Sequence, residues 1–176
     1  PEFFGGGPKN TNHSWDGVIR WYSSKDFKNW TDHGTVIDKG IWTGDPETSD
    51  ADCIGAASPG VTIVGDKVFL FYSARGKQDP AGPFCSSLER GQKGALCGRI
   101  MLASAEIDEN GCPEEDFVKH GVVVPLGSGW MSTRLDDPWP VVYENEVLLF
   151  FFFLGARKGG DGVVCALSRT DIDKAN

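Results

Sequence analysis

The chain has 176 residues, of which 40% are hydrophobic and 24% are charged, so it can bury a core and is not a disordered tail. Its net charge of −8 does not provide the basic face that phosphate binding needs, and we expect no nucleic-acid partner. The longest apolar run, VLLFFFFLGA at 147–156, has the length of a buried strand and not of a membrane-spanning helix, so we expect no membrane partner.

Short strands joined by turns are predicted along the whole chain. The chain contains 23 Gly and 10 Pro and hardly any stretch with the 3.6-residue period of a helix. We therefore expect an all-β fold. In chain order, the predicted strands are 17–24, 33–37, 59–64, 67–74, 98–105, 120–124, 139–143, 146–153 and 162–168.

Two sequence units recur among these strands. The first is a Gly, five mostly apolar residues and a Ser, in GVIRWYSS from Gly17, GRIMLASA from Gly98 and GVVCALSR from Gly162. After the first two copies, a His-Gly pair precedes a β-branched run. The second unit is SPGVTIVGDKVFLFYS from Ser58, which aligns without a gap with DPWPVVYENEVLLFFF from Asp137, 79 residues later. Both copies of the second unit predict a strand, a tight turn and a strand.

Repeated four-stranded meanders are typical of a β-propeller. The strands divide into the end of one blade at 17–37, a full blade at 59–124 and a partial blade at 139–176. Residues 1–176 are thus expected to form a single propeller segment of about two and a half blades. A β-sandwich is the alternative, but a sandwich does not need homologous copies in sequence. The unpaired strands at the blade edges invite association with other chains.

Three stretches carry a family resemblance: YSSKDFKNWTDHGTVI at 22–37, GAASPGVTIVGDKVFLFYSA at 55–74 and RLDDPWPVVYENEVLLFFFF at 134–153. In this order they resemble the end of the first blade, the second blade and the third blade of five-bladed propeller glycoside hydrolases. That group comprises arabinanases, xylosidases, fructosidases and neoagarooligosaccharide hydrolases. The resemblance implies a five-bladed propeller that cleaves glycosidic bonds in oligo- or polysaccharides.

The resemblance also implies a role for Asp137. Glycoside hydrolysis uses one carboxyl group as acid and one as base or nucleophile, and in this family a third sets the pKa of the acid. The residue before the innermost strand of a blade points at the ligand, and here it is Asp137, with Ser58 as its repeat partner. Asp137 is thus expected to be the auxiliary carboxylate. The family's base and acid belong to stretches that this sequence does not contain, so we expect both outside it.

Ordinary structural roles compete with these assignments. Asp-Pro is a frequent turn starter, and Asp136 could face inward in place of Asp137. Arg134 could hold a sugar hydroxyl or pair with Asp136, and the salt bridge is the simpler role.

Aromatic and imidazole side chains complete the set of candidates. Trp42, Trp130 and Trp139 lie on predicted loops or strand starts near the ligand-facing mouth of the propeller channel. A ring there can stack on the apolar face of a sugar, although each Trp suits the core equally well. His33 and His120 belong to the His-Gly repeat and have no triad partner, so we interpret them as structural.

The five Cys give no CxxC pair and no His/Cys cluster, so we expect neither a metal site nor a cofactor. Cys85 and Cys97 flank a polar loop, and we expect a disulfide between them in an oxidising compartment. Two glycosylation acceptor triplets, NHS at 12–14 and NWT at 29–31, agree with a secreted protein.

Two functions of different classes follow. The first is a glycoside hydrolase. The second is a non-catalytic propeller module that binds carbohydrate or a protein partner, since fold alone does not give function. A glycoside phosphorylase would need a basic phosphate pocket, and Arg75, Arg90, Arg99 and Arg134 are too scattered along the chain to predict one.

Overall fold

The computed structural model describes residues 17–43, 49–77, 96–125, 134–144, 146–154 and 164–170, with only the backbone given at 77, 96–97, 134, 153–154 and 164–170. In these ranges the regular elements are β1 (Ile19–Ser23), β2 (Thr31–Ile37), β3 (Gly55–Val64), β4 (Lys67–Lys77), β5 (Leu96–Glu106), β6 (Val118–Val124), β7 (Arg134–Tyr143), β8 (Glu146–Leu154) and β9 (Val164–Thr170). The all-β prediction is confirmed. The described part of the chain contains no helix long and apolar enough to cross a membrane.

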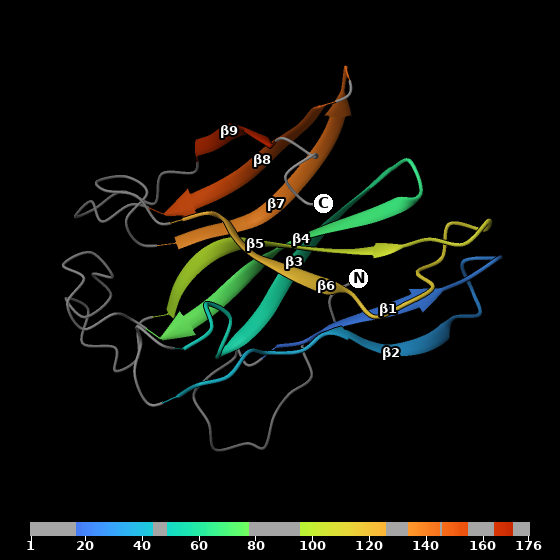
Figure 1. The fold of residues 1–176 in the computed structure, drawn as a ribbon, viewed down its shortest axis with the longest axis horizontal. Helices are drawn as coiled ribbons and strands as arrows, with labels where there is room; N and C mark the ends of the chain where they lie inside the picture. The colour runs from blue at the N-terminus through green and yellow to red at the C-terminus, as the bar shows by residue number, and fades with distance from the viewer. Residues whose placement is uncertain are drawn as a thin grey trace.

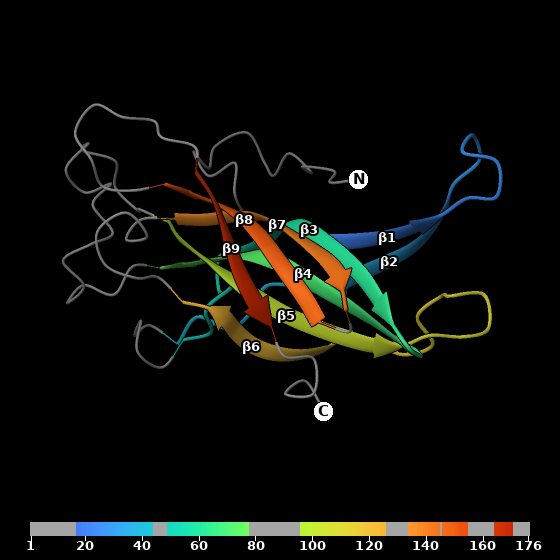
Figure 2. The ribbon, with the colours of Figure 1, turned by 90° about the horizontal axis from the view of Figure 1, so that it is seen from above.

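Three antiparallel groups of strands follow one another, as Figure 1 shows from β1 and β2 at the bottom to β7, β8 and β9 at the top. We call them blade A (β1–β2), blade B (β3–β4–β5–β6) and blade C (β7–β8–β9). A single parallel bridge, Gly98 to Arg134, joins β5 to β7. Seen from above, β8 crosses over β4 (Figure 2), so blades B and C also stack face to face.

Strands β3 and β7 begin earlier than the sequence predicts, at Gly55 and Arg134 instead of at 59 and 139. The Ser58-Pro59 and Asp137-Pro138 steps look like turns because the residue before a proline avoids the helical region and proline donates no hydrogen bond. In the structure each step is a bulge within a strand, and the strand pairs with its neighbour both before and after the bulge. Asp137 therefore lies inside β7 and not ahead of it.

The repeats of the sequence are also repeats of the backbone. Gly34 in β2 and Gly121 in β6 have φ of 96° and 92°, a region that favours glycine, and each follows a bulged His. Each His lies within hydrogen-bond distance of the Ser of the first repeat. These pairs are Ser23 Oγ with His33 Nε2 at 2.8 Å and Ser104 Oγ with His120 Nε2 at 2.7 Å. These contacts agree with the structural interpretation of both His residues.

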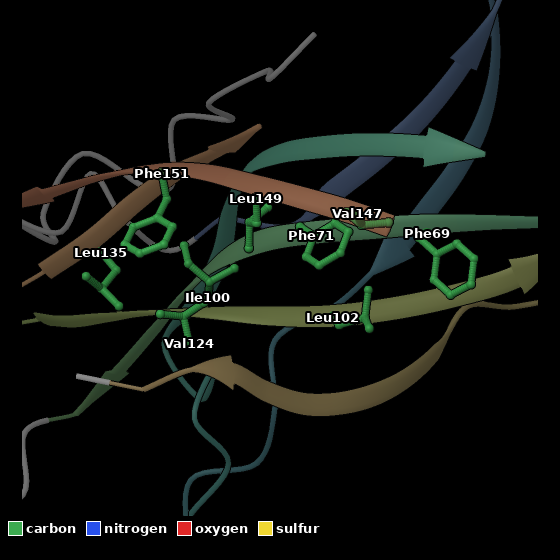
Figure 3. Close-up of a cluster of buried hydrophobic side chains, with 9 residues drawn as sticks. All are labelled: Phe69, Phe71, Ile100, Leu102, Val124, Leu135, Val147, Leu149 and Phe151. Carbon is green, nitrogen blue, oxygen red and sulfur yellow. The ribbon is translucent and has the colours of Figure 1, made fainter. Parts of the chain in front are cut away.

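Strand β4 buries both faces because it lies between two blades. Its side chains alternate, so Phe69 and Phe71 face blade C while Leu70, Tyr72 and Ala74 face blade A. The core toward blade C, drawn in Figure 3, also contains Ile100, Leu102, Val124, Leu135, Val147, Leu149 and Phe151. The core toward blade A also contains Ile19, Ile37, Ala56, Met101 and Ala103.

Gly60 marks the closest approach of β3 to β7. A Cβ at this position would lie 2.0 Å from the carbonyl oxygen of Pro138 and 2.7 Å from Cδ of Pro140. Because a backbone carbonyl cannot move away as a side chain can, Gly60→Ala should lower the free energy of unfolding by about 1–3 kcal/mol or more. Urea unfolding measures this change. Val61→Ala, at a side chain that is 54% exposed, should stay within about 0.5 kcal/mol of wild type, and an equal loss in both variants would contradict the close approach.

Candidate functional site

The candidate site is built on two equivalent bulges at the start of blades B and C. In β3, Ala57 pairs with Ser73 and Gly60 with Phe71, which leaves two residues opposite one. In β7, Asp136 pairs with Phe152 and Trp139 with Phe150, in the same register. The repeat partners Ser58 and Asp137 occupy the same position of each bulge, as the sequence alignment predicts.

Both bulge residues have a strained backbone. Ser58 and Asp137 each have φ of 49°, in the left-handed region, and each precedes a proline. Non-glycine residues with positive φ cost about 1–3 kcal/mol and persist where the surrounding structure imposes them, often at functional sites. Ser58 is half-buried and Asp137 is exposed. No hydrogen bond or ion pair among the described residues involves the Asp137 carboxylate, which is therefore accessible to a ligand.

Two residues of β4 hold the bulge of β7 in place. Ser73 Oγ accepts a hydrogen bond from the backbone N–H of Asp137 at 3.1 Å. Two residues further along the same face of β4, the Arg75 guanidinium forms an ion pair with the carboxylate of Asp136. The side chains of this pair are 1% and 5% exposed. Blade B thus fixes two successive residues of blade C with two polar side chains.

The carboxylate of Asp136 pairs with Arg75 of the neighbouring blade, a partner that was not predicted from the sequence. Asp136 is 4% exposed, so it is the inward-facing residue of the Asp-Asp pair, while Asp137 faces solvent. Arg75 was not predicted as a site residue. The signal was present, because Arg75 continues the alternation of Phe69, Phe71 and Ser73 on one face of β4. The side chain of Arg134 lies outside the described part of the chain, so its expected salt bridge with Asp136 and its expected contact with a sugar both stay predictions.

The described residues include two of the three candidate Trp residues, Trp42 and Trp139. Trp139 is 72% exposed and pairs with Phe150, which is 39% exposed, on an open face of blade C beside Asp137. Trp42 is half-buried in the segment after β2, where the Asp50 amide donates to the Ile41 carbonyl at 3.0 Å. Trp130 lies outside the described residues. Trp139 is thus the aromatic candidate that the structure places next to Asp137.

A second buried polar group joins blades A and B. The Asp52 carboxylate accepts hydrogen bonds from the Tyr72 hydroxyl at 2.9 Å and from Lys119 Nζ at 2.7 Å, and Lys119 also donates to the carbonyl oxygen of Asp38 at 2.6 Å. Burial, and next the charge of Asp52, raise the pKa of Tyr72 above its usual value. Because these partners come from three segments far apart in sequence, we interpret the group as a structural tie.

His120 should make stability depend on pH. Desolvation and, more weakly, the positive charge of Lys67 lower the pKa of His120. The unfolded chain therefore binds a proton more readily than the folded chain, so stability should be complete above about pH 6.5 and decline as pH falls through the lowered folded-state pKa. Unfolding free energies measured at pH 7.5 and 5.5 should differ less in His120→Gln than in wild type. A larger difference in the variant would contradict the desolvated ring.

Metal-ligating side chains do not gather within the described ranges, where no group of three or more His, Cys, Asp or Glu residues could hold an ion. Cys53 and Cys112 are free thiols. The expected Cys85–Cys97 disulfide involves side chains that lie outside the described residues.

Comparison with known proteins gives a structural match. No protein-family model and no curated protein matches the sequence. Among solved structures, the chain is similar to a family 117 glycoside hydrolase produced by the marine bacterium Zobellia galactanivorans, with a TM-score of 0.60 and 22% sequence identity. The match covers 88% of this chain and 38% of the length of that protein. At this identity the likeness shows the fold. It confirms the predicted partial β-propeller and its resemblance to the five-bladed propeller glycoside hydrolases.

Proposed function

We propose that this chain is part of a glycoside hydrolase that acts on oligo- or polysaccharides, with Asp137 as the auxiliary carboxylate and with the acid and base outside these 176 residues. The observation that carries the proposal is the bulge at Asp137. A strained, exposed Asp is held at the start of a propeller blade, while the neighbouring Asp136 is neutralised by Arg75. An accessible negative charge in a fixed position can keep a nearby general acid protonated.

The architecture agrees with this proposal. Ser58 and Asp137 lie within the first strands of adjacent blades, and β3 and β7 approach each other closely at Gly60 and Pro138. Residues at these two bulges can therefore contact one ligand. Arg75 pairs with Asp136 in the core, so it does not offer the phosphate contact that a glycoside phosphorylase would require.

The test uses the complete protein that contains this chain. We expect it to hydrolyse at least one of a panel of aryl arabinosides, xylosides and galactosides, whereas the 176-residue segment alone should be inactive, because an auxiliary carboxylate does not perform both proton transfers. Absence of turnover by the complete protein on this panel and on the corresponding neutral oligosaccharides would overturn the proposal. Equal activity of the segment alone would show that the acid and base lie within it.

A non-catalytic carbohydrate-binding module is the second candidate, and the position of the Trp139 ring close to Asp137 in sequence favours it. This ring is 72% exposed and lies two residues from Asp137. In a binding module, Trp139→Ala should weaken oligosaccharide binding, Asp137→Asn should leave it nearly unchanged, and no substrate should be turned over. Calorimetry on the same oligosaccharide panel separates the two functions.

A further inference from the structure

The contact between blades B and C has an apolar part and, toward the end of β4, a polar part. Four side chains alternate along one face of this strand, and the first two, Phe69 and Phe71, belong to the apolar core. The next two, Ser73 and Arg75, are 0% and 1% exposed and bond to Asp137 and Asp136. Both polar residues thus contact consecutive positions of the strained bulge.

The repeat does not conserve polar residues at these positions. The alignment that relates Ser58 to Asp137 relates Ser73 to Phe152 and Arg75 to Leu154. Blade C therefore has apolar side chains where blade B has a hydroxyl and a guanidinium. The hydroxyl and the guanidinium are therefore particular to blade B, where they contact the bulge of β7.

The hydrogen bond of Ser73 and the ion pair of Arg75 each fix a different part of the bulge. A bulge removes an N–H from the regular ladder, and Ser73 Oγ accepts this bond from Asp137. The ion pair of Arg75 turns the side chain of Asp136 toward blade B, so that the next residue, in the left-handed region, directs its side chain to solvent. Without these bonds, fewer contacts stabilise the left-handed conformation of Asp137.

We propose that Ser73 and Arg75 are positioning residues, which clamp the bulge of β7 and thereby fix the orientation of the Asp137 carboxylate toward the ligand. The catalytic part of this inference rests on the proposed function. The conformational part does not, and the two parts can be tested separately.

The conformational test is hydrogen exchange in the complete protein. Ser73→Ala should speed exchange of the Asp137 amide at least about tenfold, since its acceptor is lost, while core amides of β4 and β8 keep their rates. Ser73→Thr keeps a hydroxyl and should restore slow exchange. Ser73→Cys, close to serine in size and a weak acceptor, should behave like the Ala variant and serves if that variant does not fold. Unchanged exchange at Asp137 in both the Ala and the Cys variants would overturn the clamp.

The catalytic test separates kcat from KM. Ser73→Ala should lower kcat about tenfold with KM within twofold of wild type, and Ser73→Thr should recover most of the loss. The matched control is Ser104→Ala, which removes another strand hydroxyl that contacts His120, and it should leave kcat unchanged. Faster exchange with unchanged kcat in Ser73→Ala would overturn the positioning role. Faster exchange in a protein without any glycosidase activity would support the clamp and overturn the proposed function.

Discussion

Replacement of Arg75 by Met is expected to lower the free energy of unfolding by about 3–5 kcal/mol. The variant leaves the carboxylate of Asp136, which is 4% exposed, in the core without its cation. The ion pair with Arg75 would then no longer offset the desolvation of this carboxylate. Urea unfolding at pH 7 measures the loss, and the slope of the transition should stay constant because the same surface is exposed on unfolding.

Two further variants test this explanation. Arg75→Met combined with Asp136→Leu removes both charges and should recover much of the stability, because a buried ion pair is often replaceable by apolar residues. Arg20→Met breaks an exposed pair with Asp32, whose side chains are 39% and 44% exposed, and should remain near wild type. A double variant no more stable than Arg75→Met would show that Arg75 acts through other contacts.

The strand pattern was predictable because it depends on local signals. Alternating apolar residues and Gly or Pro punctuation indicated each strand. The gapless alignment predicted that Ser58 and Asp137 are equivalent, and in the structure both have φ of 49°. The starts of β3 and β7 were not predictable in this way. A residue before proline indicates a turn, and what keeps Asp137 in the sheet is a hydrogen bond that its N–H donates to Ser73, 64 residues away in sequence.

The ion pair of the site was hidden for the same reason. Arg75 and Asp136 are 61 residues apart, and their contact requires that blades B and C stack in one particular register. Local spacing favoured Arg134, which is two residues from Asp136, and gave no indication of Arg75. The Tyr72–Asp52–Lys119 group is a second case, since residues from three segments meet in it only after blades A and B have packed. Pairs across blades depend on tertiary packing, which composition and periodicity do not encode.

Asp137→Asn should lower kcat on the order of a hundredfold in the complete protein and leave KM within a few-fold of wild type. The amide keeps the shape of the carboxylate but removes the charge that supports protonation of the general acid. An interaction that is stronger in the transition state than in the ground state affects kcat more than binding. Steady-state kinetics across pH measures both effects. The alkaline limb of the pH–rate profile, which reports the pKa of the general acid, should move to lower pH because the acid loses its proton more readily.

The control for this variant cannot be Asp136→Asn, because the ion pair with Arg75 makes Asp136 part of the core, and its replacement would reduce stability and rate together. Asp66→Asn is the matched control. It removes the same charge from an exposed residue in the turn between β3 and β4, at the far end of the hairpin from Ser58. Its kcat and pH profile should equal those of wild type. If Asp137→Asn also equals wild type, the bulge serves the backbone alone and the reacting carboxylates lie elsewhere. If Asp66→Asn shifts the alkaline limb as far as Asp137→Asn does, the shift reflects net charge and not the position of Asp137.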